Sequence, residues 1–401
     1  MKFAGIDIAK REHWMAVVDA EGRAVLPPTA YANDSEGLAA MVADLASLGG
    51  EVEAAMESTG CYWRSCHRAL SLAGIPVAVM NPVRTCAARK SSNLGRAKTD
   101  AVDCLVIADF ARRERPAPTV SPDGDLAQLR ELARLRRSLS GDAARCKLRL
   151  TALLDQVWPE FARLFADRFC GSALASLRWL SEGSGDLDSL ADALGGASRG
   201  RFGSAKASEV AASLSSTCGV PASPAHLLEL RLLLGQLDFS AAQIAEADAA
   251  MAPLLESAAP TLRTVPGIGP ALACQIAAEV GDASRFESPG KLVALAGLDP
   301  ARFQSGGFES ERTRISKRGS AYLRRSLYIA AQAALRSDCE FRDFYDRLRA
   351  RGKSHRCAVC AVARKMLCVV WALMRSGEEY SRERHSAKGE APEGASPVEV
   401  G

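Results

Sequence analysis

Apolar residues near the start of the chain fall into short runs bounded by charged or turn-forming residues, a pattern typical of β-strands. Five such runs cover residues 2–9, 13–20, 23–30, 51–58 and 76–81. Only the charged turn from Lys10 to Glu12 separates the first two runs, which together with the third predict an antiparallel meander. Longer stretches with helical spacing start at about Ser35, Tyr62 and Thr99, and Thr99 is suited to act as an N-cap.

Long helices are predicted for the middle of the chain. Residues 125–165 carry leucines at helical spacing, and a second long helix is predicted from about Ala225. Its apolar residues alternate three and four apart, which is the spacing of a coiled-coil seam: Leu227, Leu230, Leu234, Leu237, Ala241 and Ile244. This seam would pack against the preceding helix of the same chain, against a second copy, or both. Residues 181–224 are rich in Gly, Ser and Ala, which predicts a loosely packed insertion.

The C-terminal part begins with a Pro/Gly hairpin over residues 266–270 that leads into a helix. This resembles half of a helix-hairpin-helix module, in which backbone N–H groups near Gly267 and Gly269 would suit a phosphate. A simple turn between helices is the alternative. Helical segments continue to about Met374, and the charged tail beyond Ser376 is expected to be disordered.

These elements predict an α/β plus α protein. Three early strands followed by alternating helices and strands match the order of an RNase H-like fold, and they are followed by a long helical coiled-coil middle and a mainly helical C-terminal domain. The predicted domains cover 1–118, 119–260 and 261–375, with a tail over 376–401.

Composition places the chain among ordinary soluble proteins, since 48% of its 401 residues are hydrophobic and 24% charged. Charged residues interrupt the N-terminal apolar stretch, so no secretory signal is predicted, and no uninterrupted apolar run is long enough to span a bilayer. The twelve cysteines are scattered and fit reduced core thiols. We therefore expect a cytoplasmic protein without a membrane partner.

The net charge of +4 alone does not indicate a nucleic-acid partner, but its distribution says more. Two stretches carry basic residues and no acidic one, and such stripes suit a phosphate backbone or, alternatively, form a solvated face. The first contains Arg84, Arg89, Lys90, Arg96 and Lys98, and the second contains Arg312, Arg314, Lys317, Arg318, Arg324 and Arg325.

Four acidic positions are the strongest candidates for chemistry. Asp7 and Glu57 lie in apolar strand runs, and Asp100 and Asp103 lie three apart at the head of an apolar helix, hence on one helix face. Charge at the end of a core strand is costly unless something compensates it. Converging carboxylates would be compensated by hard divalent cations, which prefer oxygen ligands, and such a site suits phosphodiester cleavage. Taken as a pair, Asp100 and Asp103 could instead be acids favoured by the helix macrodipole.

Ser305 lies in a glycine-flanked stretch, where serine is usually a turn former. The basic residues that follow it could hold a phosphate nearby, and a metal-polarised phosphodiester would then supply an electrophile for the serine.

These motifs together resemble the DEDD transposases of the IS-110 insertion-sequence family, which includes the pilin-gene invertases. The resemblance covers most of the chain, from GIDIAK at residue 5 to about Met374. Its N-terminal motifs are GIDIAK, MESTGCYW and NPVRTCAARKSSNLGRAKTDAVDCLVIADF, and its C-terminal motifs are VPGIGPALA, FESPGKLVALAGLDP, QSGG and ISKRGSAYLRRSLYIAA.

By that resemblance, Asp7, Glu57, Asp100 and Asp103 are the DEDD tetrad of a RuvC-like domain that holds Mg²⁺ or Mn²⁺. Ser305 matches the serine that the family uses as a nucleophile. The resemblance also implies donor and target DNA as substrates, a structured guide RNA called the bridge RNA, and a homo-oligomer, a dimer or tetramer, held together by the long helices.

The resulting hypothesis is a recombinase that moves its own insertion sequence through a phosphoserine–DNA link. A site-specific invertase of the same family would share these residues. A hydrolytic RuvC-like nuclease and a non-catalytic nucleic-acid scaffold are alternatives in which Ser305 is only a turn residue.

Overall fold

The computed structural model describes residues 1–58, 60–80, 99–119, 124–183, 185–301, 304–305, 308–309 and 314–382 of the chain. The chain divides into two compact units, Met1–Pro122 and Asp123–Gly401. The finer division of the second unit into helical and C-terminal domains stays a prediction.

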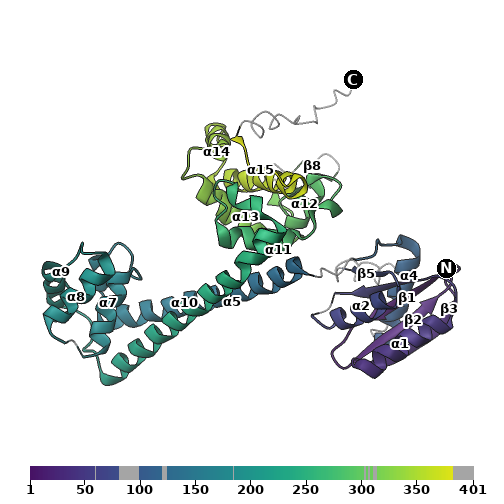
Figure 1. Ribbon diagram of the computed structural model, residues 1–401, viewed down its shortest axis with the longest axis horizontal. Helices are drawn as coiled ribbons and strands as arrows, with labels where there is room; N and C mark the ends of the chain where they lie inside the picture. The colour runs from purple at the N-terminus through teal and green to yellow at the C-terminus, as the bar shows by residue number, and fades with distance from the viewer. Residues whose placement is uncertain are drawn as a thin grey trace. The chain divides into compact units, whose positions relative to one another are not determined.

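A five-stranded sheet forms the centre of the first unit (Figure 1). Its strands are β1 (Lys2–Asp7), β2 (Glu12–Val18), β3 (Ala24–Ala32), β4 (Val52–Glu57) and β5 (Val77–Met80). Their order in the sheet is β3-β2-β1-β4-β5, in which the first three are antiparallel neighbours and β4 and β5 run parallel to β1. The predicted meander is confirmed, and this mixed order is that of an RNase H-like fold.

Helices cover both faces of this sheet because the strand residues alternate between two cores. The helices are α1 (Ser35–Ser47), α2 (Trp63–Leu72) and α4 (Asp100–Glu114). Ile6 and Met56 are buried in one core with residues of α1 and α2. Phe3 and Ala55 are buried in the other, together with Ala108 of α4.

Helix α4 approaches β1 closely at Gly5. A Cβ atom at that position would lie 2.1 Å from the carbonyl oxygen of Cys104 and 2.2 Å from the backbone nitrogen of Ala108. Only glycine allows this approach, which fixes where the first turn of α4 lies relative to β1. The predicted cap is also confirmed, since Thr99 accepts a hydrogen bond from the N–H of Val102.

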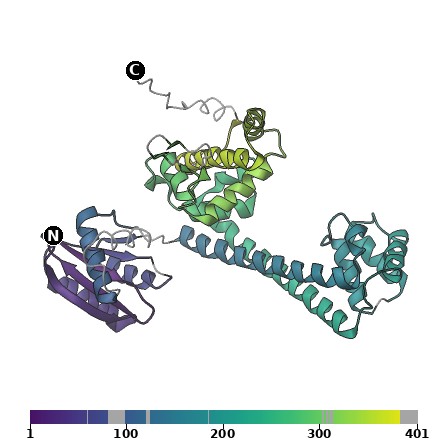
Figure 2. The same cartoon turned by 180° about the vertical axis from the view of Figure 1, so that it is seen from behind.

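Two long helices, α5 (Asp125–Val157) and α10 (Pro224–Ala258), run side by side in the second unit (Figures 1 and 2). They are antiparallel, because Asp125 accepts a hydrogen bond from Ser257 near one end and the thiol of Cys146 donates to the Leu233 carbonyl farther along. The buried face of α10 contains Leu230, Leu233, Leu234, Leu237, Ser240, Ala247, Met251 and Leu255. Of the predicted seam, Leu230, Leu234 and Leu237 are on this buried face, whereas Ala241 is exposed and Ser240 is buried instead. The coiled coil itself stays a prediction.

The prediction of a loose insertion over 181–224 is wrong. This segment contains two helices, α8 (Leu187–Ser198) and α9 (Ser204–Ser215), which join α6 (Phe161–Leu164) and α7 (Gly171–Ser181) beside the long pair. Their sparse large residues, such as Leu190 and Val210, are fully buried in a core that also contains Trp158. The abundant Gly, Ser and Ala conceal this amphipathic pattern because they dilute it without breaking it.

The C-terminal part of the second unit is mainly helical, as predicted. Its elements are η1 (Pro260–Thr264), α11 (Pro270–Val280), η2 (Ala283–Arg285), α12 (Pro289–Ala296), α13 (Ala321–Ala334), α14 (Glu340–Ala350) and α15 (His355–Ser376). Within the described residues α15 is the single helix long and apolar enough to cross a membrane, but it contributes Val359, Val362 and Leu367 to the core of this part.

The tail is ordered for several residues beyond Ser376, contrary to the prediction. The backbone N–H of Tyr380 donates to the hydroxyl of Thr264, and the Tyr380 ring stacks on Phe341. Arg382 forms an ion pair with Asp343. These contacts hold residues 377–382 against the helices, and the rest of the predicted tail lies outside the described residues.

Candidate active site

Two of the four candidate carboxylates lie at the same end of the sheet. Asp7 is the last residue of β1 and Glu57 the last of β4, and these strands are parallel neighbours with Ile6 opposite Met56. Because side chains alternate along a strand, Asp7 lies on the same face as Gly5, which is the face that α4 covers. The paired strands place Glu57 on that face as well.

The other two candidates begin α4. Gly5 contacts the helix between Cys104 and Ala108, so the preceding helical turn lies over the next strand position on that face, Asp7. Asp103 belongs to that turn and is 4% exposed, whereas Asp100 is exposed.

The thiol of Cys104 lies near two of these carboxylates, Asp7 and Asp103. Burial, and next to it the nearby carboxylate of Asp7, raise the pKa of Cys104 to about 12, and Asp103 adds to the effect. The close approach at Gly5 thus brings charges from β1 and α4 to one place. Cys104 and Gly5 were not among the predicted site residues, although a glycine inside a strand is a recognisable signal of close backbone approach.

Carboxylate oxygens are the ligands that a hard divalent cation takes, so the donor set suits Mg²⁺ or Mn²⁺. Across the described residues, however, no three His, Cys, Asp or Glu side chains gather closely enough to hold a metal ion. Thr59 and residues 81–98, between Glu57 and α4, lie outside that description. The metal site stays a prediction.

The structure places the backbone of Ser305 in a small hairpin. Strand β7 (Gln304–Ser305) pairs with β8 (Phe308–Glu309), with Ser305 opposite Phe308. This hairpin lies between β6 (Pro300–Ala301) and β9 (Arg314–Ile315), which also pair. The side chain of Ser305 is outside the described set, so its proposed role is untested.

The base of this loop is held by polar contacts. The hydroxyl of Ser316 donates to the Asp299 carboxylate at 2.5 Å, and the N–H of Lys317 donates to the Gly297 carbonyl at 3.1 Å. Lys317 has a φ of +56°, an uncommon value for a residue other than glycine. Gly297 packs closely against this turn, since a Cβ there would lie 3.0 Å from the backbone nitrogen of Arg318.

The predicted phosphate-binding residues have different environments. Lys317 and Arg318 are exposed. The stripe from Arg84 to Lys98, Arg312, and the side chain of Arg314 lie outside the described residues.

The two hairpin glycines also differ. Gly267 packs against α13, since a Cβ there would lie 2.3 Å from the Ala330 carbonyl oxygen, so packing is enough to require glycine. Gly269 is exposed at the N-cap of α11 with open space beside it. The helix-hairpin-helix assignment stays a prediction.

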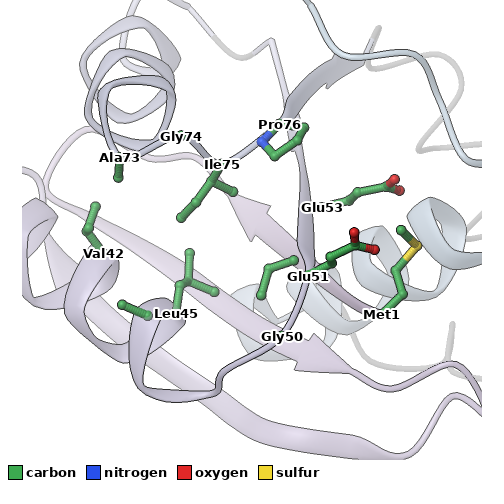
Figure 3. Close-up of a pocket in the computed structure, with 12 residues that line it drawn as sticks. Met1, Val42, Leu45, Gly50, Glu51, Glu53, Ala73, Gly74, Ile75 and Pro76 are labelled. Carbon is green, nitrogen blue, oxygen red and sulfur yellow. The ribbon is translucent and has the colours of Figure 1, made fainter.

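A pocket of about 490 Å³ in the first unit is not at this site. Figure 3 shows its apolar side chains, including Leu45 and Ile75, together with Glu51 and Glu53. Glu51 and Ile75 precede β4 and β5, whereas Asp7 and Glu57 end their strands. The pocket therefore lies at the opposite end of the sheet.

The strand order and the acidic residues at one end of the sheet define the first unit as an RNase H-like domain. Residues 4–159 match the family model described as the DEDD transposase of IS110, and residues 259–346 match the one described as the transposase of the IS116/IS110/IS902 family. The chain belongs to the IS110 family of transposases, as the sequence motifs predicted. It is therefore an enzyme of DNA transposition.

Curated relatives match over nearly the whole chain. The 43.6 kDa protein of insertion element IS110 from Streptomyces coelicolor is 29% identical, over 94% of this chain and 95% of its own. The 42 kDa protein of insertion element IS900 from Mycobacterium paratuberculosis is 28% identical, over 94% and 96%. The pilin gene-inverting protein of Moraxella bovis is 25% identical, over 82% of both chains.

A solved structure of Thermus thermophilus RuvC in complex with a Holliday junction substrate matches 30% of this chain and 99% of its own, with 18% identity and a TM-score of 0.25. Both values are low, and the fold assignment depends on the strand order described above.

Proposed function

We propose that this transposase cleaves, exchanges and rejoins DNA strands with the carboxylates of the first unit and the serine of the second. The observation that carries the proposal is the meeting of Asp7 and Glu57 at one sheet end, under the turn of α4 that bears Asp103. Family membership supports DNA as the substrate.

In the proposed reaction the carboxylates of Asp7, Glu57, Asp100 and Asp103 hold Mg²⁺ or Mn²⁺. When bound, such an ion polarises a phosphodiester and stabilises the charge of the leaving oxygen. The hydroxyl oxygen of Ser305 forms a bond to phosphorus, the bond from phosphorus to a deoxyribose oxygen breaks, and that oxygen takes up the proton that serine loses. Attack by the hydroxyl of a second strand reverses these steps and releases Ser305.

This chemistry needs no nucleotide cofactor. The serine–phosphate link replaces one phosphodiester with another phosphate ester, so the energy of the broken bond is retained for rejoining. A hydrolytic nuclease would lose it to water. Strand exchange is therefore the function that a serine and a carboxylate site together serve best.

Inversion of a DNA segment is the second candidate, because the relatives include the pilin gene-inverting protein. Transposition and inversion would use the same residues and differ in the DNA supplied. A guide RNA and a homo-oligomer belong to the proposal through the family resemblance, and the first basic stripe from Arg84 to Lys98 is our candidate for contact with nucleic acid.

A product assay separates strand exchange from hydrolysis. Full-length protein is incubated with donor and target DNA, a transcript of the element's non-coding region and Mg²⁺, and joined and cut strands are counted. We expect Ser305→Ala to lose joined products. Ser288→Ala is the matched control and should keep activity, because Ser288 is the N-cap residue before α12 and its side chain makes no capping hydrogen bond. Repeated cleavage by Ser305→Ala would instead establish a nuclease.

A further inference from the structure

An exposed tyrosine on α13 is contacted by two arginines of the neighbouring long helix. Tyr322 lies in the first turn of α13 and is 40% exposed. The guanidinium carbons of Arg134 and Arg137, both on α5, lie 4.9 and 4.7 Å from the centre of its ring. Both distances are within the range of a cation–π interaction.

The two arginines differ in what else they bind. Arg134 donates through Nε to the carboxylate of Glu279 at 3.0 Å, and that carboxylate is 5% exposed. Arg137 forms no ion pair with any carboxylate in the described part of the chain. Because a guanidinium that contacts a ring uses its face rather than its N–H groups, Arg137 keeps five donors for another acceptor.

Further cations lie on α13 and in the turn that precedes it. Arg325 is exposed three residues beyond Tyr322, on the same side of α13. Lys317 and Arg318 are exposed in the turn before the helix. None of these three has an ion-pair partner among the residues that the structure describes.

Some arginines elsewhere in this part of the unit form ion pairs. On α14, Arg342 binds Asp346, and Arg382 of the tail binds Asp343. By contrast, no described carboxylate pairs with Arg137 on α5, with Lys317 and Arg318 in the turn before α13, or with Arg325 on α13. Such a cluster raises a positive potential that attracts an extended polyanion.

We propose that Arg137, Lys317, Arg318 and Arg325, grouped around Tyr322, form a surface that binds the phosphate backbone of duplex DNA. The surface continues from the loop that carries Ser305, because β9 ends at Ile315 and Lys317 follows in the turn. This inference rests on the proposed function, since a strand attacked by Ser305 must be held close to that loop. The ring of Tyr322 fixes the Arg137 guanidinium, and its N–H groups bind a phosphate.

Arg134 and Arg137 form a matched pair for the test. Binding of a fluorescent duplex to the full-length protein is measured by anisotropy from about 50 to 200 mM salt, where each phosphate contact contributes a slope of roughly 0.9 in log K against log salt. We expect Arg137→Gln to reduce the slope by about one contact. Arg134→Gln should keep the slope and lower the unfolding temperature, because its role is the buried ion pair.

Arg137→Lys is the control that separates loss of the positive charge from a folding defect. It keeps the charge and should restore most of the slope, with weaker binding because lysine cannot contact phosphate in the bidentate manner of arginine. An unchanged slope in Arg137→Gln, or an equal loss in Arg134→Gln, would overturn the proposal. A slope change seen with structured RNA and absent with duplex DNA would also overturn it.

These readouts are independent of strand joining. If wild-type protein joins no strands while Arg137→Gln still flattens the slope, the proposed function fails and the DNA-binding surface stands. If joining depends on Ser305 while the Arg137 slope is unchanged, the surface fails and the function stands.

Discussion

Asp103 is the most deeply buried of the four candidate carboxylates, with 4% of its surface exposed. A carboxylate in that position requires compensation, and its place in the first turn of α4 supplies part of it through the helix dipole. A cation shared with Asp7 and Glu57 would supply more. The proposal therefore depends on the negative charge of these side chains. Replacement of a carboxylate by its amide tests it, because the charge is removed while the shape is kept.

Glu57 and Glu53 allow this to be tested on one strand. They lie four residues apart on β4. Glu57 is at the candidate site, whereas Glu53 lines the pocket at the opposite end of the sheet. Substitution of a metal ligand removes more than the 10- to 100-fold that loss of its supporting partners costs. We expect Glu57→Gln to lose more than about 100-fold of Mg²⁺-dependent strand cleavage in a plasmid-nicking assay, with DNA binding retained.

Glu53→Gln should cleave DNA at the wild-type rate. Full activity of Glu57→Gln would contradict the assignment of Glu57. Equal inactivation by both substitutions would show that the loss reflects the strand and not the site.

Individual site residues were predictable where the sequence pattern dictates their backbone position. Asp7 and Glu57 could be placed on strands because they lie in apolar runs, and Asp103 in the first turn of a helix because Thr99 caps that helix. The environment of Cys104 could not be foreseen, since it depends on the contact between α4 and β1. Packing of Gly267 against α13 could not be foreseen either, because Gly267 and Ala330 are more than sixty residues apart in the sequence.

At the scale of elements, the contact of α4 with β1 positions the candidate site. Gly5→Ala would bring a methyl group within 2.2 Å of the α4 backbone and force the helix away. Overpacking of this kind typically costs about 1–3 kcal/mol, and here the obstacle is backbone that cannot rotate aside. We expect a loss of about 3 kcal/mol in the free energy of unfolding of the first unit, measured by urea denaturation.

Gly235→Ala provides the control for that experiment. Gly235 lies within α10 with nothing near its missing side chain, and alanine favours a helix interior by about 1 kcal/mol over glycine. It should not destabilise the protein. Wild-type stability of Gly5→Ala would show that α4 does not need its close approach.

A second element-scale prediction concerns pH. Glu160, just after α5, accepts hydrogen bonds from the hydroxyl of Thr217 at 2.5 Å and from the N–H of Cys218 at 3.1 Å. These bonds lower the pKa of Glu160 to about 2 from its ordinary value of 4.5. A lowered carboxylate pKa stabilises the folded state above pH 4.5, and this contribution is lost as the pH falls towards 2.

Comparison of wild type with Glu160→Gln isolates this contribution. The difference between their unfolding temperatures should be present at pH 6 and shrink as the pH falls from about 4.5 to 2. A difference that does not change with pH would mean that the charge of Glu160 does not stabilise its contact with Thr217 and Cys218.

Element type was predictable where periodicity is strong, as in the strands of the sheet and the long helices. The prediction of element type failed over 181–224, where few large residues mark the buried faces of α8 and α9. The prediction failed again just after Ser376, because Arg382 of the tail forms an ion pair with Asp343 of α14. In both cases tertiary contacts override a composition typical of loops.

At the scale of the whole molecule, the catalytic residues we propose are divided between two units. The carboxylates belong to Met1–Pro122, and Ser305 belongs to Asp123–Gly401. In the reaction that we propose, strand exchange requires both sets, so an oligomer supported by the long helices would matter to the chemistry. The sequence motifs predicted this division of residues, but no sequence pattern fixes how the units assemble on DNA.

The most direct test of the central claim is to map the covalent link between protein and DNA. Full-length protein is trapped on a donor DNA with Mg²⁺, digested with trypsin and nuclease, and the modified peptide is identified by mass spectrometry. We predict a nucleotide phosphate on Ser305, absent in Glu57→Gln. A link at another residue, or joined strands without any protein-linked intermediate, would contradict the account.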